Sequence, residues 1–429
     1  MKLNSHRFSM KNIMPLFVFL ILFFVACGER KVDSNFTNPA VKSVPKLQKV
    51  TFYLENSESM FGYVNGLTEY VQVISELSSK SDFVTNGISK EFFLINGRTP
   101  LSVIPLGDVS SSLNSVLSST GFRRGNTNSS ELNEMLKLAM KNSGNGKISI
   151  FISDGIFDIN QRGDIARYLT LESGVTKANF INRLSGTSIF ETLLIKLNSN
   201  FNGKYFYASR PVVTRINKKR PYYIWVFGDS QVVNQYFSES FINKSLVGRT
   251  DYLRFIKLGS SNVQYGITKV INQKGKFDVE RNNPHSIENA VKDPSGSFSF
   301  SFAVDLSSIP FSESYFTNKS NYSLSNNYQI SSIQRIRPAQ KAFLPIINNF
   351  KPTHIITLIC KPQTSHLGGI DLQLKYVLPK WINISSPTQE VVDSTSTYGF
   401  DKLTSGIAEA YNVHNQNKNL AEFKFQINR

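Results

Sequence analysis

The sequence predicts an α/β fold, in which a parallel sheet is covered by helices on both faces and is followed by a mainly antiparallel β domain. First, continuous apolar runs alternate with segments of helical spacing over roughly the first 245 residues, a pattern typical of parallel strands buried on both faces. Second, glycine, serine, asparagine and threonine become more frequent after that point, and strict alternation of apolar and polar residues replaces helical spacing. Third, 429 residues are enough for two domains of this kind.

Each expected element rests on one of these patterns. In the first domain, apolar and β-prone runs predict strands at residues 50–54, 92–95, 147–153, 205–207 and 222–227. Apolar residues at helical spacing predict helices at residues 67–77, 132–140, 189–197 and 232–237, with Ser130 as the N-cap of the second. In the second domain, alternation predicts strands at residues 297–302, 371–377 and 420–427, and a late helix carries Leu403, Ile407 and Tyr411 on one face.

The first 26 residues have the pattern of an export signal. Three basic residues and no acidic residue precede an apolar run at residues 13–26. This run is shorter than the roughly 20 apolar residues that a membrane-spanning helix needs. Residues 1–26 are therefore expected to form a cleaved signal peptide.

The end of this segment, Phe24-Val25-Ala26-Cys27-Gly28, resembles the cleavage site of a bacterial lipoprotein signal. The resemblance implies that Cys27 becomes the acylated N-terminus and that the mature protein is held by lipid in the bacterial cell envelope, with the outer membrane as the expected location. The polar residues 27–47 would then form a tether between lipid and fold. An ordinary signal peptide with a chance cysteine is the alternative.

The composition narrows the possible partners and sites. Two cysteines exclude a disulfide-stapled scaffold, and five histidines far apart in sequence give no metal-binding spacing. The formal net charge of +17 suits anionic lipid or an acidic partner, and export argues against nucleic acid as the partner. The densest basic cluster, Lys218-Lys219-Arg220, is interpreted as a solvated turn before a strand.

Oxygen-bearing side chains gather where predicted strands end. Glu55, Ser57 and Ser59 follow the first strand, and Asp154 follows the strand at residues 147–153. Between them, Thr127 lies in a loop just before a helix. Ligands of parallel α/β sheets bind at the carboxyl ends of the strands, and oxygen ligands suit hard cations such as Mg²⁺, Mn²⁺ or Ca²⁺.

This order of motifs resembles the von Willebrand factor A-type (vWA) domain, a Rossmann-like α/β fold, over residues 48 to about 245. That family has Asp-x-Ser-x-Ser after its first strand, a threonine in a middle loop and an aspartate after its fourth strand, which together form the metal-ion-dependent adhesion site (MIDAS). The resemblance implies that Ser57, Ser59 and Thr127 contact a divalent cation, with Mg²⁺ expected first, and that Asp154 acts beside it. An acidic residue of a partner protein completes the coordination. Glu55 stands where the family has aspartate, and its carboxylate lies one methylene further out.

Two other functions remain open on the sequence. Phe227-Gly228-Asp229-Ser230 resembles the Gly-Asp-Ser block of a serine esterase family, in which Ser230 would be a nucleophile that needs a histidine base. The late Asp-x-x-His of that family is missing here, so Asp229 and Ser230 are interpreted as the cap of a helix. A metal-free structural lipoprotein, in which Glu55 marks a decayed site, is the other alternative.

The sequence thus predicts a lipid-anchored envelope protein that is not an enzyme. A vWA-like domain at residues 48–245 is expected to bind a partner protein through a divalent cation, and a β-rich domain of unassigned role is expected at residues 246–429.

Overall fold

The computed structural model describes residues 45–429 apart from 108–112, 160–162, 187–188, 208–211, 258–262, 269–271, 310, 325–326, 338–349, 362–366, 393–394, 417–418 and 429. The expected signal peptide, the expected lipidation site Cys27 and nearly all of the expected tether lie outside these residues. Within the described part of the chain, no helix is both long and apolar enough to cross a membrane.

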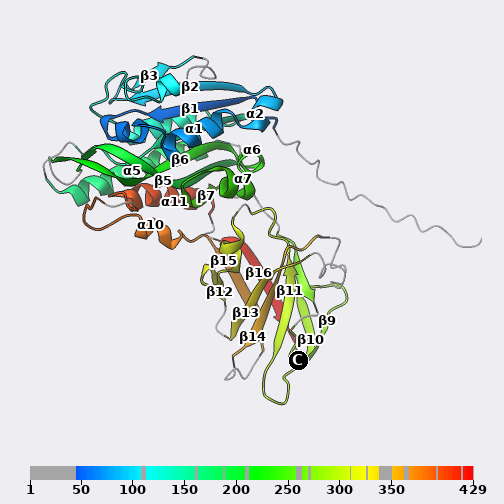
Figure 1. Cartoon of the computed structure of the whole chain (residues 1–429). Helices are drawn as coiled ribbons and strands as arrows, with labels where there is room; N and C mark the ends of the chain where they lie inside the picture. The colour runs from blue at the N-terminus through cyan, green and yellow to red at the C-terminus, as the bar shows by residue number, and fades with distance from the viewer. Residues whose placement is uncertain are drawn as a thin grey trace, which may run out of the picture. The chain divides into compact units, whose positions relative to one another are not determined.

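A seven-stranded sheet forms the centre of the α/β part (Figure 1). Its order is β3-β2-β1-β4-β6-β5-β7. The strands are β1 (Lys49–Glu55), β2 (Ser89–Asn96), β3 (Ser102–Pro105), β4 (Lys147–Ser153), β5 (Phe190–Phe206), β6 (Val213–Asp229) and β7 (Arg249–Ile256). Strand β1 runs parallel to both β2 and β4, whereas the other neighbouring pairs are antiparallel.

The sheet is therefore mixed, and the expectation of a parallel sheet is correct only for β2, β1 and β4. The reason is the long hairpin of β5 and β6, since strands joined by a short connection must pair antiparallel. The parallel core of β2, β1 and β4 is nevertheless present, and it brings the carboxyl ends of β1 and β4 to one edge.

Helices cover both faces of this sheet, as expected. One face carries η1 (Glu58–Val64), α1 (Glu69–Ser78), α2 (Ser81–Thr85), α6 (Ser230–Tyr236) and α7 (Glu239–Ser245). The other carries α4 (Leu132–Lys141), α5 (Ile165–Leu184) and α11 (Phe400–His414). Neighbouring residues of β1 point to opposite faces, so Phe52 packs into the first core and Tyr53 into the second.

The helix expected at residues 189–197 is wrong, because these residues begin strand β5. Residues 190–197 are all buried, and a continuous apolar run fits a central strand as well as one side of a helix. The two charged residues within it, Glu191 and Lys196, find polar partners that the sequence pattern does not reveal. Helix α4 is present, but Glu131 rather than Ser130 occupies its N-cap position.

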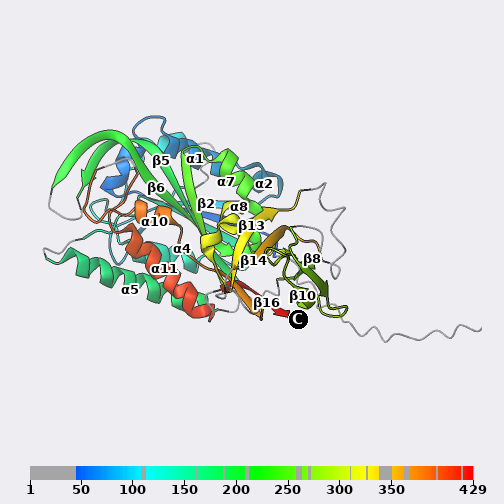
Figure 2. The same ribbon diagram turned by 90° about the horizontal axis from the view of Figure 1, so that it is seen from below.

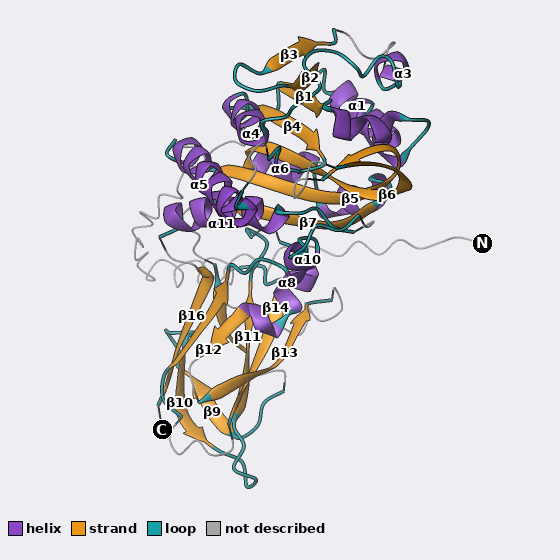
Figure 3. Ribbon diagram, turned by 90° about the vertical axis from the view of Figure 1, so that its left-hand side faces the viewer, coloured by secondary structure: helices purple, strands orange, loops and turns teal. Residues whose placement is uncertain are grey.

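The remaining strands form two further sheets (Figure 3). The five-stranded sheet has the order β12-β15-β16-β10-β9, and the four-stranded sheet has the order β13-β14-β11-β8. Their strands are β8 (Tyr265–Thr268), β9 (Lys276–Val279), β10 (Ser286–Val291), β11 (Ser299–Val304), β12 (Tyr322–Leu324), β13 (Tyr328–Arg335), β14 (His354–Cys360), β15 (Ile370–Lys375) and β16 (Asn419–Ile427). The three strands expected by alternation correspond to β11, β15 and β16, and all pairs except β10 with β16 are antiparallel.

Two segments beyond residue 245 belong to the α/β part. Strand β7 pairs with β5 at the edge of the seven-stranded sheet. Helix α11 lies beside α5 (Figure 2), where Ser173 donates a hydrogen bond of 2.8 Å to the carbonyl of Lys402. Strand β16 then pairs with β15 in the five-stranded sheet, so the chain crosses between the parts more than once and a single boundary at residue 245 does not describe it. Three short helices, α3 (Leu113–Val116), α8 (Glu313–Thr317) and α10 (Lys380–Ile384), lie in the connections.

Candidate functional site

The two acidic residues of the predicted site end neighbouring strands. Glu55 is the last residue of β1, and Asp154 follows β4 directly. Because Leu54 stands opposite Ile152 in the parallel register, both carboxylates emerge at the same edge of the sheet. Their exposed fractions are only 1% and 2%. The fold thus places two carboxylates in a setting where an ionised group needs partners.

Two serine hydroxyls connect these carboxylates. Ser57 Oγ donates a hydrogen bond of 2.7 Å to Glu55 Oε1 and lies 3.1 Å from Ser59 Oγ. Ser59 in turn acts on Asp154, since it lowers the pKa of that carboxyl group. Ser57 occupies the N-cap position of η1 but makes no capping bond, so its hydroxyl serves the cluster rather than the helix. We call Glu55, Ser57, Ser59 and Asp154 the hydroxyl–carboxylate chain.

Two asparagine side chains hold the loop before α4 against the hydroxyl–carboxylate chain. Asn56 Nδ2 donates to the carbonyls of Phe122 and Arg124, each over 2.8 Å. Asn96 at the end of β2 donates to Asn56 Oδ1 over 2.7 Å. The backbone N–H of residue 58 also donates to the carbonyl of Thr127 over 2.8 Å. These buried bonds hold the loop before α4 at the carboxyl edge of the sheet, beside the end of β1.

The five predicted residues therefore meet at one place. Glu55, Ser57, Ser59 and Asp154 interact directly through their side chains. Thr127 joins them on the wall of a shared pocket, next to Ser57 and Ser59.

Burial governs the protonation of the two acids. It raises the pKa of Glu55 to about 7, and the negative charge of Asp154 adds to this shift. Hydrogen bonds from Ser153, Ser57 and Ser130 act in the opposite direction because they stabilise the carboxylate. Burial also raises the pKa of Asp154, and the positive charge of Arg220 opposes that rise.

Arg220 also acts on this site, although the sequence does not indicate it. Its interpretation as part of a solvated turn is wrong, because the residue lies within β6 and is only 2% exposed. Its guanidinium lies over the ring of Tyr205 at 4.4 Å, and its Nη1 has no hydrogen-bond partner among the described residues. No local signal marks it, because β6 does not alternate here: Lys218 and Lys219 are both exposed, whereas Arg220 and the residues after it are buried.

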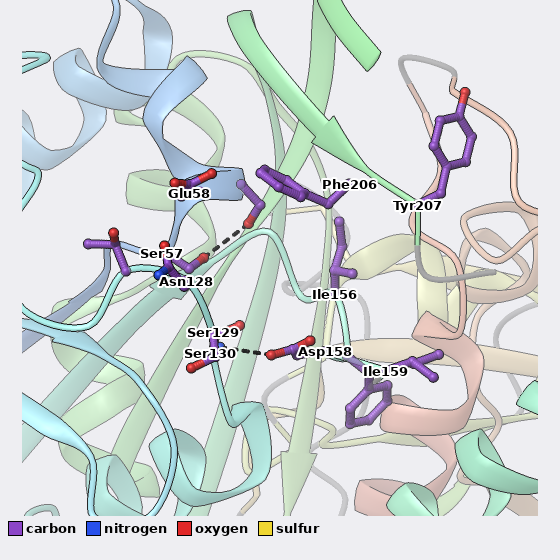
Figure 4. A pocket seen from close by; sticks show the side chains of 13 residues that line it. Ser57, Glu58, Asn128, Ser129, Ser130, Ile156, Asp158, Ile159, Phe206 and Tyr207 are labelled. Carbon is purple, nitrogen blue, oxygen red and sulfur yellow. Dashed lines mark hydrogen bonds between the residues drawn. The ribbon is translucent and has the colours of Figure 1, made fainter. Parts of the chain in front are cut away.

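A pocket of about 270 Å³ opens beside the hydroxyl–carboxylate chain (Figure 4). One side carries the polar side chains of Ser57, Glu58, Ser59, Thr127, Asn128, Ser129, Ser130 and Asp158. The other side carries Ile156, Phe157, Ile159, Phe206 and Tyr207. In Figure 4, Ser130 lies next to Asp158, to which its backbone N–H donates over 3.4 Å. The pocket can therefore hold a polar group against the hydroxyls and an apolar group against the facing wall.

The donor set at this place consists only of oxygen atoms. Hydroxyl and carboxylate oxygens suit Mg²⁺, Mn²⁺ and Ca²⁺ and do not suit softer metals. Within the described residues, no group of three or more His, Cys, Asp or Glu side chains could hold a metal ion. A cation at this site would depend on serine and threonine hydroxyls together with its two carboxylates.

Ser230, the nucleophile of the alternative function, lies in a different network. Its Oγ donates to Glu191 Oε2 over 2.7 Å, and Glu191 forms a buried ion pair with Arg254. No described histidine hydrogen-bonds Ser230. Asp229 occupies the N-cap position of α6, but its carboxylate accepts from the backbone N–H of Gly146 over 3.1 Å instead of capping the helix.

No family model, curated protein or solved structure matches this chain.

Proposed function

We propose that this chain binds a partner protein through a divalent cation, Mg²⁺ in the first place, held at the carboxyl ends of β1 and β4. The observation that carries the proposal is the hydroxyl–carboxylate chain, in which Ser57 and Ser59 link Glu55 to Asp154. The order of these residues resembles the MIDAS motif, and the α/β sheet with helices on both faces is compatible with a vWA-like domain.

The residues present fit such an ion. Ser57, Ser59 and Thr127 would supply hydroxyl oxygens, and Asp154 would supply negative charge. Glu55 would orient Ser57 by accepting a hydrogen bond from its hydroxyl, which leaves the oxygen lone pairs of the hydroxyl free for a cation. A bound cation would supply a coordination position for an acidic side chain of the partner.

Arg220 would lower the affinity of this site for a cation. Its positive charge acts on Asp154 from within the protein, so it offsets part of the charge that would attract a cation. This observation is also the one that favours the metal-free structural alternative, in which a guanidinium balances the buried acids permanently. Measured cation binding separates the two.

We further propose that the protein is exported and anchored by lipid in the bacterial cell envelope, with a protein rather than a nucleic acid as its partner. The support is the basic and apolar pattern of residues 1–26 and the position of Cys27 behind it. The serine hydrolase alternative has weaker support, because the Ser230 hydroxyl donates its hydrogen bond to Glu191 of the buried Glu191–Arg254 ion pair.

Calorimetric titration of the purified protein with Mn²⁺ tests the proposal. The wild-type protein is expected to bind one ion, and Ser57→Ala is expected to weaken this binding at least tenfold. Ser312→Ala is a matched control, because Ser312 is also a serine at a helix N-cap but caps α8, far along the chain from β1. Equal binding by wild type and Ser57→Ala would contradict the proposal.

A further inference from the structure

A second, smaller pocket adjoins the candidate site across Glu58. Its volume is about 130 Å³, and Glu58 lines both pockets. The lining residues come from η1 and the connection after it, from the loop before residue 124 and from the β5–β6 hairpin: Glu58, Phe61, Asn65, Ser119, Arg123, Asn202, Gly203, Lys204 and Arg215. The two pockets are thus parts of one surface at the carboxyl edge of the sheet.

The second pocket carries an excess of positive charge. Arg123, Lys204 and Arg215 face one carboxylate, that of Glu58, from which Lys204 Nζ lies 3.5 Å. Arg215 is exposed and makes no hydrogen bond or ion pair with any described residue. Two more cations than anions therefore line a space of side-chain size, and this charge is not neutralised within the described part of the protein.

The arginine on one wall is held in place. The Arg123 guanidinium lies over the ring of Phe61 at 4.4 Å, and its Nε donates to the carbonyl of Ser119 over 2.9 Å. These contacts restrain the side chain while the terminal nitrogens remain available as donors. A restrained guanidinium loses little conformational entropy on binding and can donate two parallel hydrogen bonds to a carboxylate.

The opposite wall is fixed by close packing of η1 against β5. A Cβ atom on Gly203 would lie 2.7 Å from the Cα of Gly62, so the two backbones touch where neither residue has a side chain. This contact sets the position of Lys204 relative to Glu58. Glu58 and Lys204 therefore stand on two elements whose backbones are in close contact at Gly62 and Gly203.

We propose that this second pocket binds a carboxylate side chain of the partner, next to the acidic residue that the cation would hold. The inference deepens the proposed function and rests on it for the partner being a protein. It commits to an acidic segment with at least two carboxylates, one on each side of Glu58. A protein side chain is favoured over a lipid surface because the cations line a recessed pocket rather than a flat face.

Fluorescence anisotropy with a labelled hexaglutamate peptide tests this subsite. Titrations are made with the full-length protein in EDTA and in Mg²⁺, with hexaglutamine as the uncharged comparison. Arg123→Gln/Arg215→Gln is compared with Lys276→Gln/Lys361→Gln, which removes the same charge from two exposed lysines, one in β9 and one directly after β14. The arginine variant is expected to weaken hexaglutamate binding at least tenfold in EDTA, whereas the lysine variant changes it less than twofold.

Each outcome decides one question. An equal loss in both variants would show that net charge alone attracts the peptide and would overturn the subsite. Absence of hexaglutamate binding at 50 mM salt would overturn it as well, and so would binding of the wild type to phosphatidylglycerol vesicles but not to the peptide. The proposed function fails separately, if Mg²⁺ does not strengthen peptide binding to the wild type relative to Ser57→Ala while the arginine effect in EDTA persists.

Discussion

Ser57 Oγ donates a hydrogen bond of 2.7 Å to Glu55 Oε1, within the turn that follows β1. This bond ties the hydroxyl to a buried acid whose pKa burial raises to about 7. It also directs the free lone pairs of the hydroxyl away from Glu55. The glutamate side chain thus reaches the hydroxyl of the serine two residues later in the sequence.

Replacement of Arg220 by methionine tests the charge balance of the site. The Arg220→Met side chain keeps apolar packing under Tyr205 but removes the positive charge that acts on Asp154. We expect Mn²⁺ affinity to increase about tenfold, because a like charge no longer opposes the cation. Calorimetric titration measures the change, and weaker binding by the variant would contradict this role of Arg220.

Replacement by alanine is expected to change the free energy of unfolding in opposite directions at two glycines, Gly62 in η1 and Gly174 in α5. A Cβ atom on Gly62 would overlap the ring of Phe201, so Gly62→Ala is expected to lower the free energy of unfolding by about 1–3 kcal/mol. Gly174 lies inside α5, where a Cβ atom would meet open space. Gly174→Ala is therefore expected to raise the free energy of unfolding by about 0.5–1 kcal/mol. Urea denaturation compares the two variants, and a stable Gly62→Ala protein would show that this wall is not rigid.

The buried ion pair of Glu191 and Arg254 is expected to matter more for stability than an exposed ion pair. Glu191→Gln leaves the Arg254 charge buried without its counter-ion and should cost about 3–5 kcal/mol of stability. Glu409→Gln breaks the exposed pair with Lys177 and should cost at most about 1 kcal/mol. Chemical denaturation measures both values. Similar costs for the two variants would mean that the buried pair is compensated in another way.

Stability should depend on pH through His354. Burial lowers its pKa below the usual 6.5, although Glu313 opposes this shift from α8 and Asp305 does so more weakly, while Arg335 reinforces it. The unfolded chain therefore takes up a proton before the folded protein does as the pH falls. The contribution of neutral His354 is complete above about pH 6.5 and is lost below it, down to the folded pKa. Urea midpoints at pH 7.5 and 5.5 should differ more for the wild type than for His354→Gln, and equal differences would contradict this assignment.

Sequence patterns located the candidate site but not its charge balance. The ends of β1 and β4 could be predicted because apolar strands followed by polar turns are local signals, and parallel pairing then brings Glu55 and Asp154 together. Arg220 could not be placed, since its burial depends on the pairing of β6 with β4 and β5 rather than on its neighbours in sequence. Long-range pairing also turned residues 189–197 from an expected helix into a strand.

Local sequence patterns could not predict how far the α/β part extends, for the same reason. Strand β7 extends the sheet only because β5 leaves one edge free after pairing with β6. Helix α11 was expected from its apolar face, but the sequence does not state that this face packs on α5. Amphipathic spacing predicts that a helix has a buried side and leaves open which surface covers it.

Thermal unfolding in the presence of divalent cations tests the central claim most directly. A cation that binds only the folded protein at a hundredfold excess over its Kd stabilises it by about 2.7 kcal/mol. We expect Mg²⁺, Mn²⁺ or Ca²⁺ to raise the Tm of the wild type and to leave the Tm of Ser57→Ala/Asp154→Ala unchanged, with both proteins unfolding cooperatively in EDTA. A wild-type Tm that does not respond to any of the three ions, or one that rises equally in the variant, would contradict the cation site.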